Sequence, residues 1–131
     1  EFDLTVIREG IRILRALRSE EKIVITYFGG IRSGTDAAKL IAMGCSTVVL
    51  GASVGFALGA ELRNGTFTFP SDRSSEELQS AAENFLKASS GEASMMARCT
   101  GKTNIHSLEP EDLRAITIPT AEDCGIPLIG T

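Results

Sequence analysis

The opening of the chain carries apolar residues at three- and four-residue steps, with charged residues in most of the positions between them. The apolar residues are Leu4, Ile7, Ile11, Leu14 and Leu17. This spacing places one apolar stripe along a helix, because an α-helix completes a turn about every 3.6 residues. It therefore predicts an amphipathic helix over residues 3–20.

Two short apolar runs follow, and glycine ends each of them. Residues 23–28 end at Gly29 and Gly30, and residues 47–50 end at Gly51. Both runs are rich in β-branched side chains and lack polar alternation. They predict strands that are buried on both faces, as in a parallel sheet.

Helical segments separate and follow the two predicted strands. Ser33 stands three residues before Asp36, a pattern that starts helices, and the apolar positions after it continue to Gly44, which is placed to end one. A further helix is expected over residues 53–62. Strands alternating with helices in this way predict parallel pairing through right-handed crossovers, the unit of α/β sheets and (β/α)8 barrels.

The second half of the chain has a different character. An Arg-Asn-Gly turn at residues 63–65 leads into a polar region, where Ser74 and Glu77 predict a capped helix to about residue 89 and residues 93–98 predict another. Pro110 and its acidic neighbours predict a short helix. We therefore expect two parts: residues 1–64 as strand and helix units, and residues 65–131 as a mainly helical extension that packs on them.

Two strands are too few for a parallel sheet with a closed core. A (β/α)8 barrel has eight strands and typically about 250 residues. The interpretation is that the missing strands come from another chain, another copy or a longer precursor, and that the isolated chain forms oligomers. A small independent three-layer domain with strands not evident in the pattern is the alternative.

Composition narrows the function classes. The 131 residues include 13 basic and 17 acidic side chains, a net charge of −4, and no Arg- or Lys-rich run. This balance argues against a nucleic-acid partner, and the longest apolar stretches are too short for a membrane span. Cys45, Cys99 and Cys124 are too far apart for a metal-ligand pair, so the expectation is reduced thiols in a cytoplasmic protein without a metal site. Cys45 is expected to be a packing residue, and either of the other two could lie nearer the surface.

The glycine turns after the predicted strands are the candidate site. Glycine lets the backbone approach an anion without a Cβ clash, and free amides at a helix start can hold phosphate oxygens. Adjacent parallel strands would bring both turns to one edge, where they could share one phosphate. The candidate binding residues are Gly29, Gly30, Ile31, Arg32, Gly51 and Ala52.

The two turns also carry a resemblance to a known family. Residues 29–45 (GGIRSGTDAAKLIAMGC) and 48–52 (VVLGA) resemble the last two strands of FMN-dependent barrels. The continuation at residues 51–59 and three later segments, 97–102, 106–113 and 125–128, resemble the FMN-binding domain of glutamate synthase and its archaeal-type relatives. The match is good over residues 23–62 and 95–131 and poor between them. Directly after the second glycine turn this chain has Ala52, which resembles glutamate synthases. Hydroxy-acid oxidases typically have Arg at this position.

The resemblance implies a fold, a cofactor and a reaction. The fold is α/β: the last two β/α units of a TIM (β/α)8 barrel with a mainly helical carboxyl-terminal extension. The cofactor is FMN, and the reaction is glutamate formation from 2-oxoglutarate and glutamine-derived ammonia, in which the protein supplies binding and orientation. The groups that bind the small-molecule substrate are expected in earlier strands, so the catalytic residues are unknown and this chain alone is expected to be inactive.

Two departures from the family pattern limit what can be transferred. Phe28 stands where many barrel relatives have an acidic or small residue before the glycine pair, and residues 59–74 contain no cysteine. Glutamate synthases carry a cysteine-rich segment there for an iron-sulfur cluster. Because a cluster needs several thiolates held together, the prediction is that this chain holds none.

Other polar residues are weaker candidates. His106 is the single histidine and has no ligand set around it, and Glu109, Glu111 and Asp112 fit the start of a short helix rather than a catalytic pair. Arg32 is the charged side chain best placed for a phosphate or a carboxylate. The competing hypothesis for the whole chain is a non-catalytic phosphate-binding or assembly module that completes a split barrel.

Overall fold

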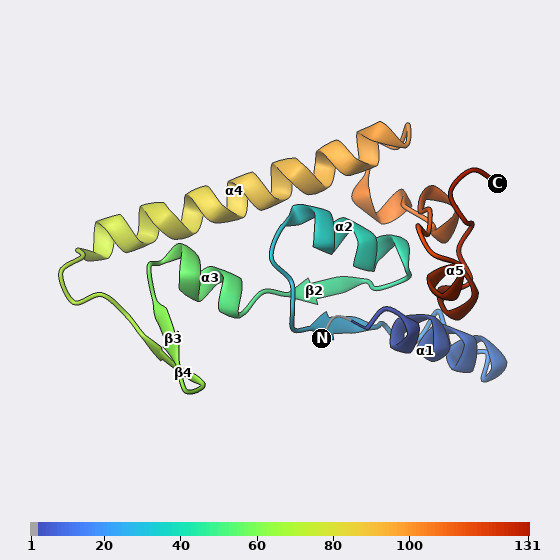
Figure 1. Cartoon of the computed structure of the whole chain (residues 1–131), viewed down its shortest axis with the longest axis horizontal. Coiled ribbons are helices and arrows are strands. Elements are labelled where there is room, and N and C mark those ends of the chain that lie inside the picture. Colours follow the sequence, from blue (N-terminus) through green and yellow to red (C-terminus); the bar gives the residue numbers. More distant parts are fainter. Residues whose placement is uncertain (1–2) are drawn as a thin grey trace.

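The computed structural model describes residues 3–131, so the first two residues of the predicted 1–64 unit lie outside the described part. The elements in chain order are α1 (Thr5–Ala16), β1 (Thr26–Phe28), α2 (Gly34–Ala42), β2 (Thr47–Val49), α3 (Ala52–Ala57), β3 (Glu61–Arg63), β4 (Thr66–Thr68), α4 (Ser75–Cys99), η1 (Ile105–Ser107), η2 (Pro110–Asp112) and α5 (Ile118–Cys124). Figure 1 shows a mixed α/β arrangement in which α2 and α4 lie on one side of a short parallel strand pair and α1 and α5 lie near one end of it.

The predicted parallel pairing of the two apolar runs is confirmed. β1 and β2 pair in parallel, with Tyr27 opposite Val48 and Phe28 opposite Val49. Both strands are shorter than the runs that predicted them, and α2 connects them as a crossover helix. Their carboxyl ends therefore lie at the same edge of the pair, as parallel connection requires.

One face of this strand pair is covered and the other is open. Tyr27 and Val48 pack against the main core, whereas Thr26, Phe28 and Val49 are exposed on the opposite face. Phe28 is 73% exposed, an unusual value for a phenylalanine next to a strand edge. The strands were predicted to be buried on both faces, but in this chain only one face is covered.

The main core lies where α1, α2 and the carboxyl-terminal segment meet. Its fully covered side chains come from widely separated parts of the sequence: Ile7, Ile31, Leu40, Met43, Cys45, Ala115, Cys124 and Ile126. An isolated parallel bridge between Ala115 and Leu128 holds the last segment against this cluster. The carboxyl-terminal residues therefore contribute to the same core as the first helix.

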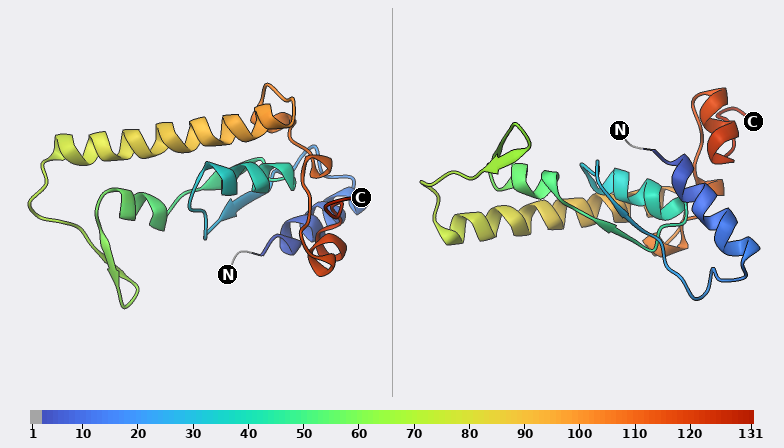
Figure 2. Two further views of the ribbon diagram at one scale, coloured as in Figure 1. Left: turned by 45° about the horizontal axis from the view of Figure 1, so that its top comes forward. Right: turned by 90° about the horizontal axis from the view of Figure 1, so that it is seen from below.

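A second cluster joins α2 to α4 through small side chains. Ala38 and Ala42 of α2 meet Ala93 and Ala97 of α4, and Leu108 closes the cluster. Small residues let two helices approach closely, and Gly34 at the start of α2 lies directly against the backbone of α4. Figure 2 shows that α4 runs alongside both α3 and α2 over most of the molecule's length.

Two predictions about helices were wrong. The helix expected over residues 53–62 ends at Ala57, because Gly59 adopts a positive φ of 85° and Leu62 belongs to strand β3. The two helices expected at 74–89 and 93–98 are one continuous helix, α4. Gly91 does not interrupt it, because the packing of Ala93 and Ala97 on α2 stabilises the helix through that point.

The region of the Arg-Asn-Gly turn forms an antiparallel hairpin that was not predicted. β3 and β4 pair around Asn64 and Gly65, both of which have positive φ values. Phe56 of α3 and Phe67 of β4 make an edge-to-face contact, with ring centroids 5.6 Å apart. The hairpin spans residue 64, the position predicted to separate the two parts of the chain.

Candidate functional site

The two glycine turns lie side by side at the carboxyl edge of the strand pair. The register that places Phe28 opposite Val49 brings Gly29 and Leu50 to equivalent positions just beyond the strands. The Phe28 ring also reaches across to the second turn, since a Cβ on Gly51 would lie 3.4 Å from its Cε2 atom. The convergence predicted from two separate segments is therefore present.

The first turn has a backbone that favours glycine. Gly29 and Gly30 have φ values of 115° and 67°, in the region that side chains disfavour, and the space beside Gly29 is open. Ile31 is 5% exposed and anchors the end of the turn in the main core. The turn is thus anchored in the core at Ile31 and open at Gly29.

Arg32 is held by an acid four residues further along. Its backbone amide donates to Oδ2 of Asp36 at 3.0 Å, and its Nε lies 3.4 Å from the same oxygen. Asp36 is buried, whereas the Arg32 side chain is 86% exposed. The predicted pairing of this guanidinium with a carboxylate is present, and the amide of Arg32 already has an acceptor.

The second turn begins α3. Gly51 is the N-cap residue, and the first two amides of the helix, those of Ala52 and Ser53, have no acceptor within the helix, whereas the Val54 amide donates to the Gly51 carbonyl oxygen at 3.0 Å. Ser53 follows in the same turn, and its Oγ is a buried oxygen without a hydrogen-bond partner among the described residues. Buried hydroxyls normally have a partner, so this oxygen indicates a place where a further polar group would be satisfied.

A glutamate from α4 occupies the start of α2. The Gly34 amide donates to Oε2 of Glu92 at 2.9 Å, and the hydroxyl of Thr35 donates to Oε1 of the same carboxylate. Ser33, which was expected to cap this helix with its side chain, makes no such bond. A carboxylate at a helix start is favourable because it accepts free amides and interacts with the positive end of the helix dipole.

The residues of the two turns fit a phosphate group. At this edge of the strands lie two glycines with positive φ and the start of α3, which offers the amides of Ala52 and Ser53 and the unpartnered Ser53 hydroxyl. The Glu92 carboxylate occupies the neighbouring start of α2. The Gly34 amide therefore already has an acceptor, whereas the glycine turns remain open.

Other residues considered in the sequence have structural roles. Glu109 and Asp112 form the reciprocal cap of η2, and Lys102 lies 3.2 Å from Asp112. The Glu109 amide and Lys102 together hold the pKa of Asp112 below its usual value. The His106 amide donates to Asn104, which starts η1. Within residues 3–131, no three His, Cys, Asp or Glu side chains gather as metal ligands.

The cysteines follow the expected packing in part. Cys45 is buried in the main core, as predicted, and burial raises the pKa of its thiol to about 11. Cys124 is also buried, and desolvation raises its pKa, with Asp123 adding to the effect. Cys99 is exposed on the last turn of α4. None of the helices in the described chain is long and apolar enough to cross a membrane.

Comparison with known proteins gives one relative. A glutamate synthase large subunit-like protein of Rhizobium meliloti strain 1021 is 32% identical to this chain. The alignment is 157 positions long and includes 98% of the chain. The chain is therefore similar to part of this glutamate synthase large subunit-like protein. It spans about a third of the length of this curated relative, 36%. No family model and no solved structure matches the chain.

The similarity covers nearly the whole chain, including both glycine turns. Two features of the site were not predicted from the sequence. Glu92 lies 58 positions from Gly34, whose amide it accepts at the start of α2. The Ser53 hydroxyl is buried without a hydrogen-bond partner among the described residues. The sequence showed that Gly34 and Thr35 follow the glycine pair, but it did not identify the Glu92 carboxylate as their acceptor.

Proposed function

We propose that this chain supplies the FMN phosphate-binding turns of a glutamate synthase-like flavin oxidoreductase. In this proposal, its parallel strands are the last two of a (β/α)8 barrel. The observation that carries the proposal is the convergence of two glycine turns at one edge of a parallel strand pair. In many barrels the loops after the last two strands hold a phosphate.

The turns provide the phosphate contacts through their backbone. The amides of Gly29, Gly30 and Ile31 come from the first turn, and those of Gly51 and Ala52 from the second. Glycine at these positions allows an oxyanion to approach the amides closely. These contacts position the cofactor, which supplies the electron transfer when it is bound.

Two polar groups adjust to the phosphate in this proposal. The Ser53 hydroxyl has no partner in the described chain, so it has a free donor. Arg32 is already bonded to Asp36, and its amide has to exchange that acceptor before it contacts a phosphate. Its guanidinium, which is mostly exposed, can reach an anion without such an exchange.

The remaining barrel strands are the partner that the open sheet face requires. Thr26, Phe28, Thr47 and Val49 lie exposed on the side where the interior of a closed barrel would be. Oxygens of Thr26 and Thr47 lie 2.7 Å apart on this face and tie the two strands together. We propose that strands from another chain or from a longer form of the protein cover this face in a cytoplasmic enzyme.

The test is flavin binding by the protein together with the strands that complete the barrel. We expect an absorption spectrum with flavin bands, and we expect Gly30→Val and Gly51→Val to lower FMN affinity by at least about 10-fold. Gly101→Val is the matched control for Gly30→Val, because both glycines have positive φ, 80° and 67°, and a Cβ at Gly101 would meet open space. FMN affinity that is unchanged in both turn variants would refute the proposal.

The assembly-module hypothesis makes a different prediction for the same preparation. Under that hypothesis the open sheet face is covered by the same strands, but the complex is colourless and does not bind added FMN. The exposed Phe28 and Val49 are the observation in its favour, since they require a partner whether or not flavin is present. Titration of the complex with FMN, followed by fluorescence quenching, distinguishes the two.

A further inference from the structure

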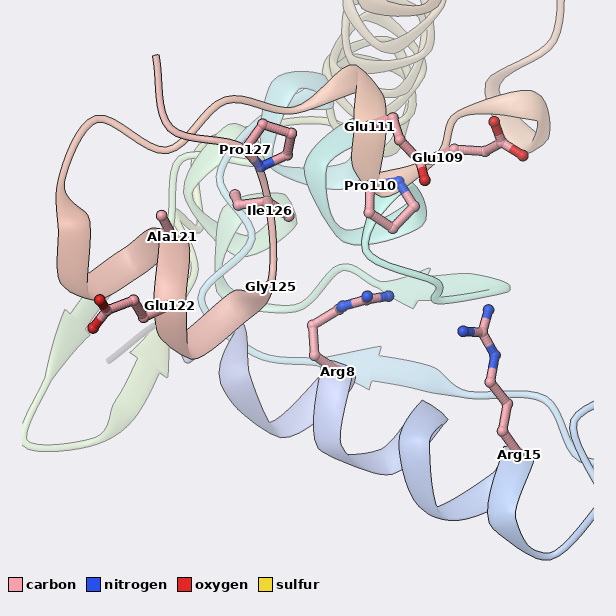
Figure 3. A pocket seen from close by; sticks show the side chains of 10 residues that line it. All are labelled: Arg8, Arg15, Glu109, Pro110, Glu111, Ala121, Glu122, Gly125, Ile126 and Pro127. Atoms are coloured by element: carbon pink, nitrogen blue, oxygen red, sulfur yellow. The ribbon is translucent and has the colours of Figure 1, made fainter. Parts of the chain in front are cut away.

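A cavity of about 730 Å³ lies between α1, η2 and the carboxyl-terminal segment. Arg8 and Arg15 of α1 form one wall, and Pro110, Gly125 and Pro127 contribute to the others (Figure 3). Its volume is within the usual range of small-molecule sites, roughly 300 to 1,000 Å³. In Figure 1 the strands β1 and β2 point away from α1 and α5, so the cavity is far from the glycine turns.

Arg8 is oriented by a contact at the end of α5. Its Nε donates to the carbonyl oxygen of Cys124 at 3.1 Å, and the residue is half-buried. That bond uses one nitrogen of the guanidinium and leaves the two terminal nitrogens directed into the cavity (Figure 3). A guanidinium held in this way presents the planar fork that binds carboxylates and phosphates in a bidentate manner.

Arg15 adds a second guanidinium to the same wall. It lies seven residues after Arg8, two turns along the same helix face, and both guanidinium groups extend toward Pro110 in Figure 3. Among residues 3–131, no carboxylate oxygen lies within 4.0 Å of a guanidinium nitrogen of either arginine. Arg12 lies between them and lines the adjoining recess.

The acidic residues at the cavity do not neutralise these arginines. Glu109 lies 3.4 Å from Lys102, and both Glu109 and Glu122 extend away from the guanidinium groups in Figure 3. Glu111 also lines the cavity, but among the described residues it forms no ion pair with either arginine. The two guanidinium groups therefore face a cavity that three glutamates also line, with no carboxylate of the described residues within 4.0 Å of either one. An anionic group would gain charge-assisted hydrogen bonds there, while the acidic rim favours a small ligand over an extended acidic surface.

We propose that this cavity binds the oxyanion group of a small molecule, a carboxylate or a phosphate, with Arg8 and Arg15 as its anchors. The site is separate from the proposed flavin phosphate site and does not depend on that assignment. Arg8 also connects the ligand to the fold, because its Nε bond joins α1 to α5. A bound oxyanion therefore stabilises the contact between the first and last helices of the chain.

The test is isothermal titration of the purified protein with succinate and, separately, with inorganic phosphate, at constant ionic strength because exposed charges are screened by salt. We expect saturable binding of at least one of them below about 10 mM. Succinate binding alone identifies a carboxylate site, and phosphate binding alone identifies a phosphate site. Binding of neither anion would overturn the proposal.

Variants separate a specific site from general attraction to positive charge. Arg15→Gln removes one exposed anchor and should weaken binding by about 10-fold, whereas Arg8→Lys keeps the charge but loses the fork and should also weaken it. Arg18→Gln changes the net charge equally outside the cavity lining and should leave affinity within about 2-fold. An equal loss in Arg18→Gln would overturn the proposal.

A last comparison keeps the two proposals distinguishable. Gly51→Val should leave succinate and phosphate affinity at the arginine cavity unchanged, whatever it does to flavin binding. Circular dichroism of each variant establishes that α1 and α5 are still folded. If Arg8→Lys disturbs folding, Arg15→Gln still decides the outcome, because Arg15 is exposed and makes no hydrogen bond to another described side chain.

Discussion

Replacement of Gly34 by alanine tests the packing that places α4 on α2. A Cβ at Gly34 would lie 2.0 Å from the carbonyl oxygen of Ser89 and 2.7 Å from the backbone nitrogen of Ala93. Both atoms belong to the α4 backbone, so no side-chain rotation can relieve the contact. The two helices have to separate, which also pulls Glu92 away from the Gly34 amide.

The size of the effect follows from two opposing terms. Alanine is favoured over glycine in a helix by up to about 1 kcal/mol, which would stabilise the variant. Forcing extra volume into a packed interface typically costs about 1 to 3 kcal/mol, and the rigid backbone at Gly34 places this case at the upper end. Loss of the Glu92 bonds adds to the cost, because hydrogen bonds to charged groups contribute about 1.5 to 3 kcal/mol.

We therefore expect Gly34→Ala to lower the free energy of unfolding by about 2 to 4 kcal/mol. Urea unfolding followed by circular dichroism should show a midpoint that is lower by about 1 to 2 M. Gly91→Ala is the control, since nothing lies within 4 Å of a Cβ there and α4 is helical at that point. It should raise stability by about 0.5 to 1 kcal/mol.

An unchanged or higher urea midpoint for Gly34→Ala would refute this reasoning. It would mean that α4 is not held against the start of α2, and the capping role of Glu92 would then be lost as well. A parallel decrease in Gly91→Ala would instead show that α4 is not a continuous helix through residue 91.

Three further predictions follow from the same interactions. Glu92→Ala should cost about 1 to 2 kcal/mol in urea unfolding, because it leaves the first amides of α2 without an acceptor. Asp112 has a folded pKa below its unfolded value of 3.8, mainly through its bond from the Glu109 amide, so its contribution is present above that value and lost as the pH falls through the folded pKa. The thermal midpoint should therefore fall less between pH 5 and about pH 3 in Asp112→Asn than in the parent, and an identical fall would contradict the assignment. Iodoacetamide should modify the exposed Cys99 of the native protein quickly and the buried Cys45 slowly, since burial raises the pKa of Cys45 to about 11, and peptide mass spectrometry measures both.

Local patterns in the sequence determined the elements whose signals lie within a few residues. The apolar spacing of the first helix, the β-branched runs at the two strands and the Ser74–Glu77 capping box all correspond to observed features. The first helix and both strands are shorter than predicted, and the capped helix is longer. The parallel pairing also followed from local order, because a helix between two strands permits that connection far more readily than a hairpin.

Patterns in the sequence also placed the candidate site but not its polar partners. Gly29, Gly30 and Gly51 were identifiable because a glycine after a predicted strand allows a backbone that other residues disfavour. Their approach to each other depends on strand register, which the pairing of Phe28 with Val49 fixes. The bond from Arg32 to Asp36 is local, four residues apart, and its two residue types were compatible with it.

Tertiary structure alone decided the features that depend on distant segments. The continuity of α4 through Gly91 depends on its contact with α2, and the cap at Gly34 comes from Glu92, which no local pattern connects to it. The arginine cavity likewise forms only when the carboxyl-terminal segment returns to α1, an arrangement held by the bond from Arg8 to Cys124. Propensity and spacing act over one or two turns of chain, whereas close packing joins residues about 60 to 120 positions apart, so it is packing that decides these contacts.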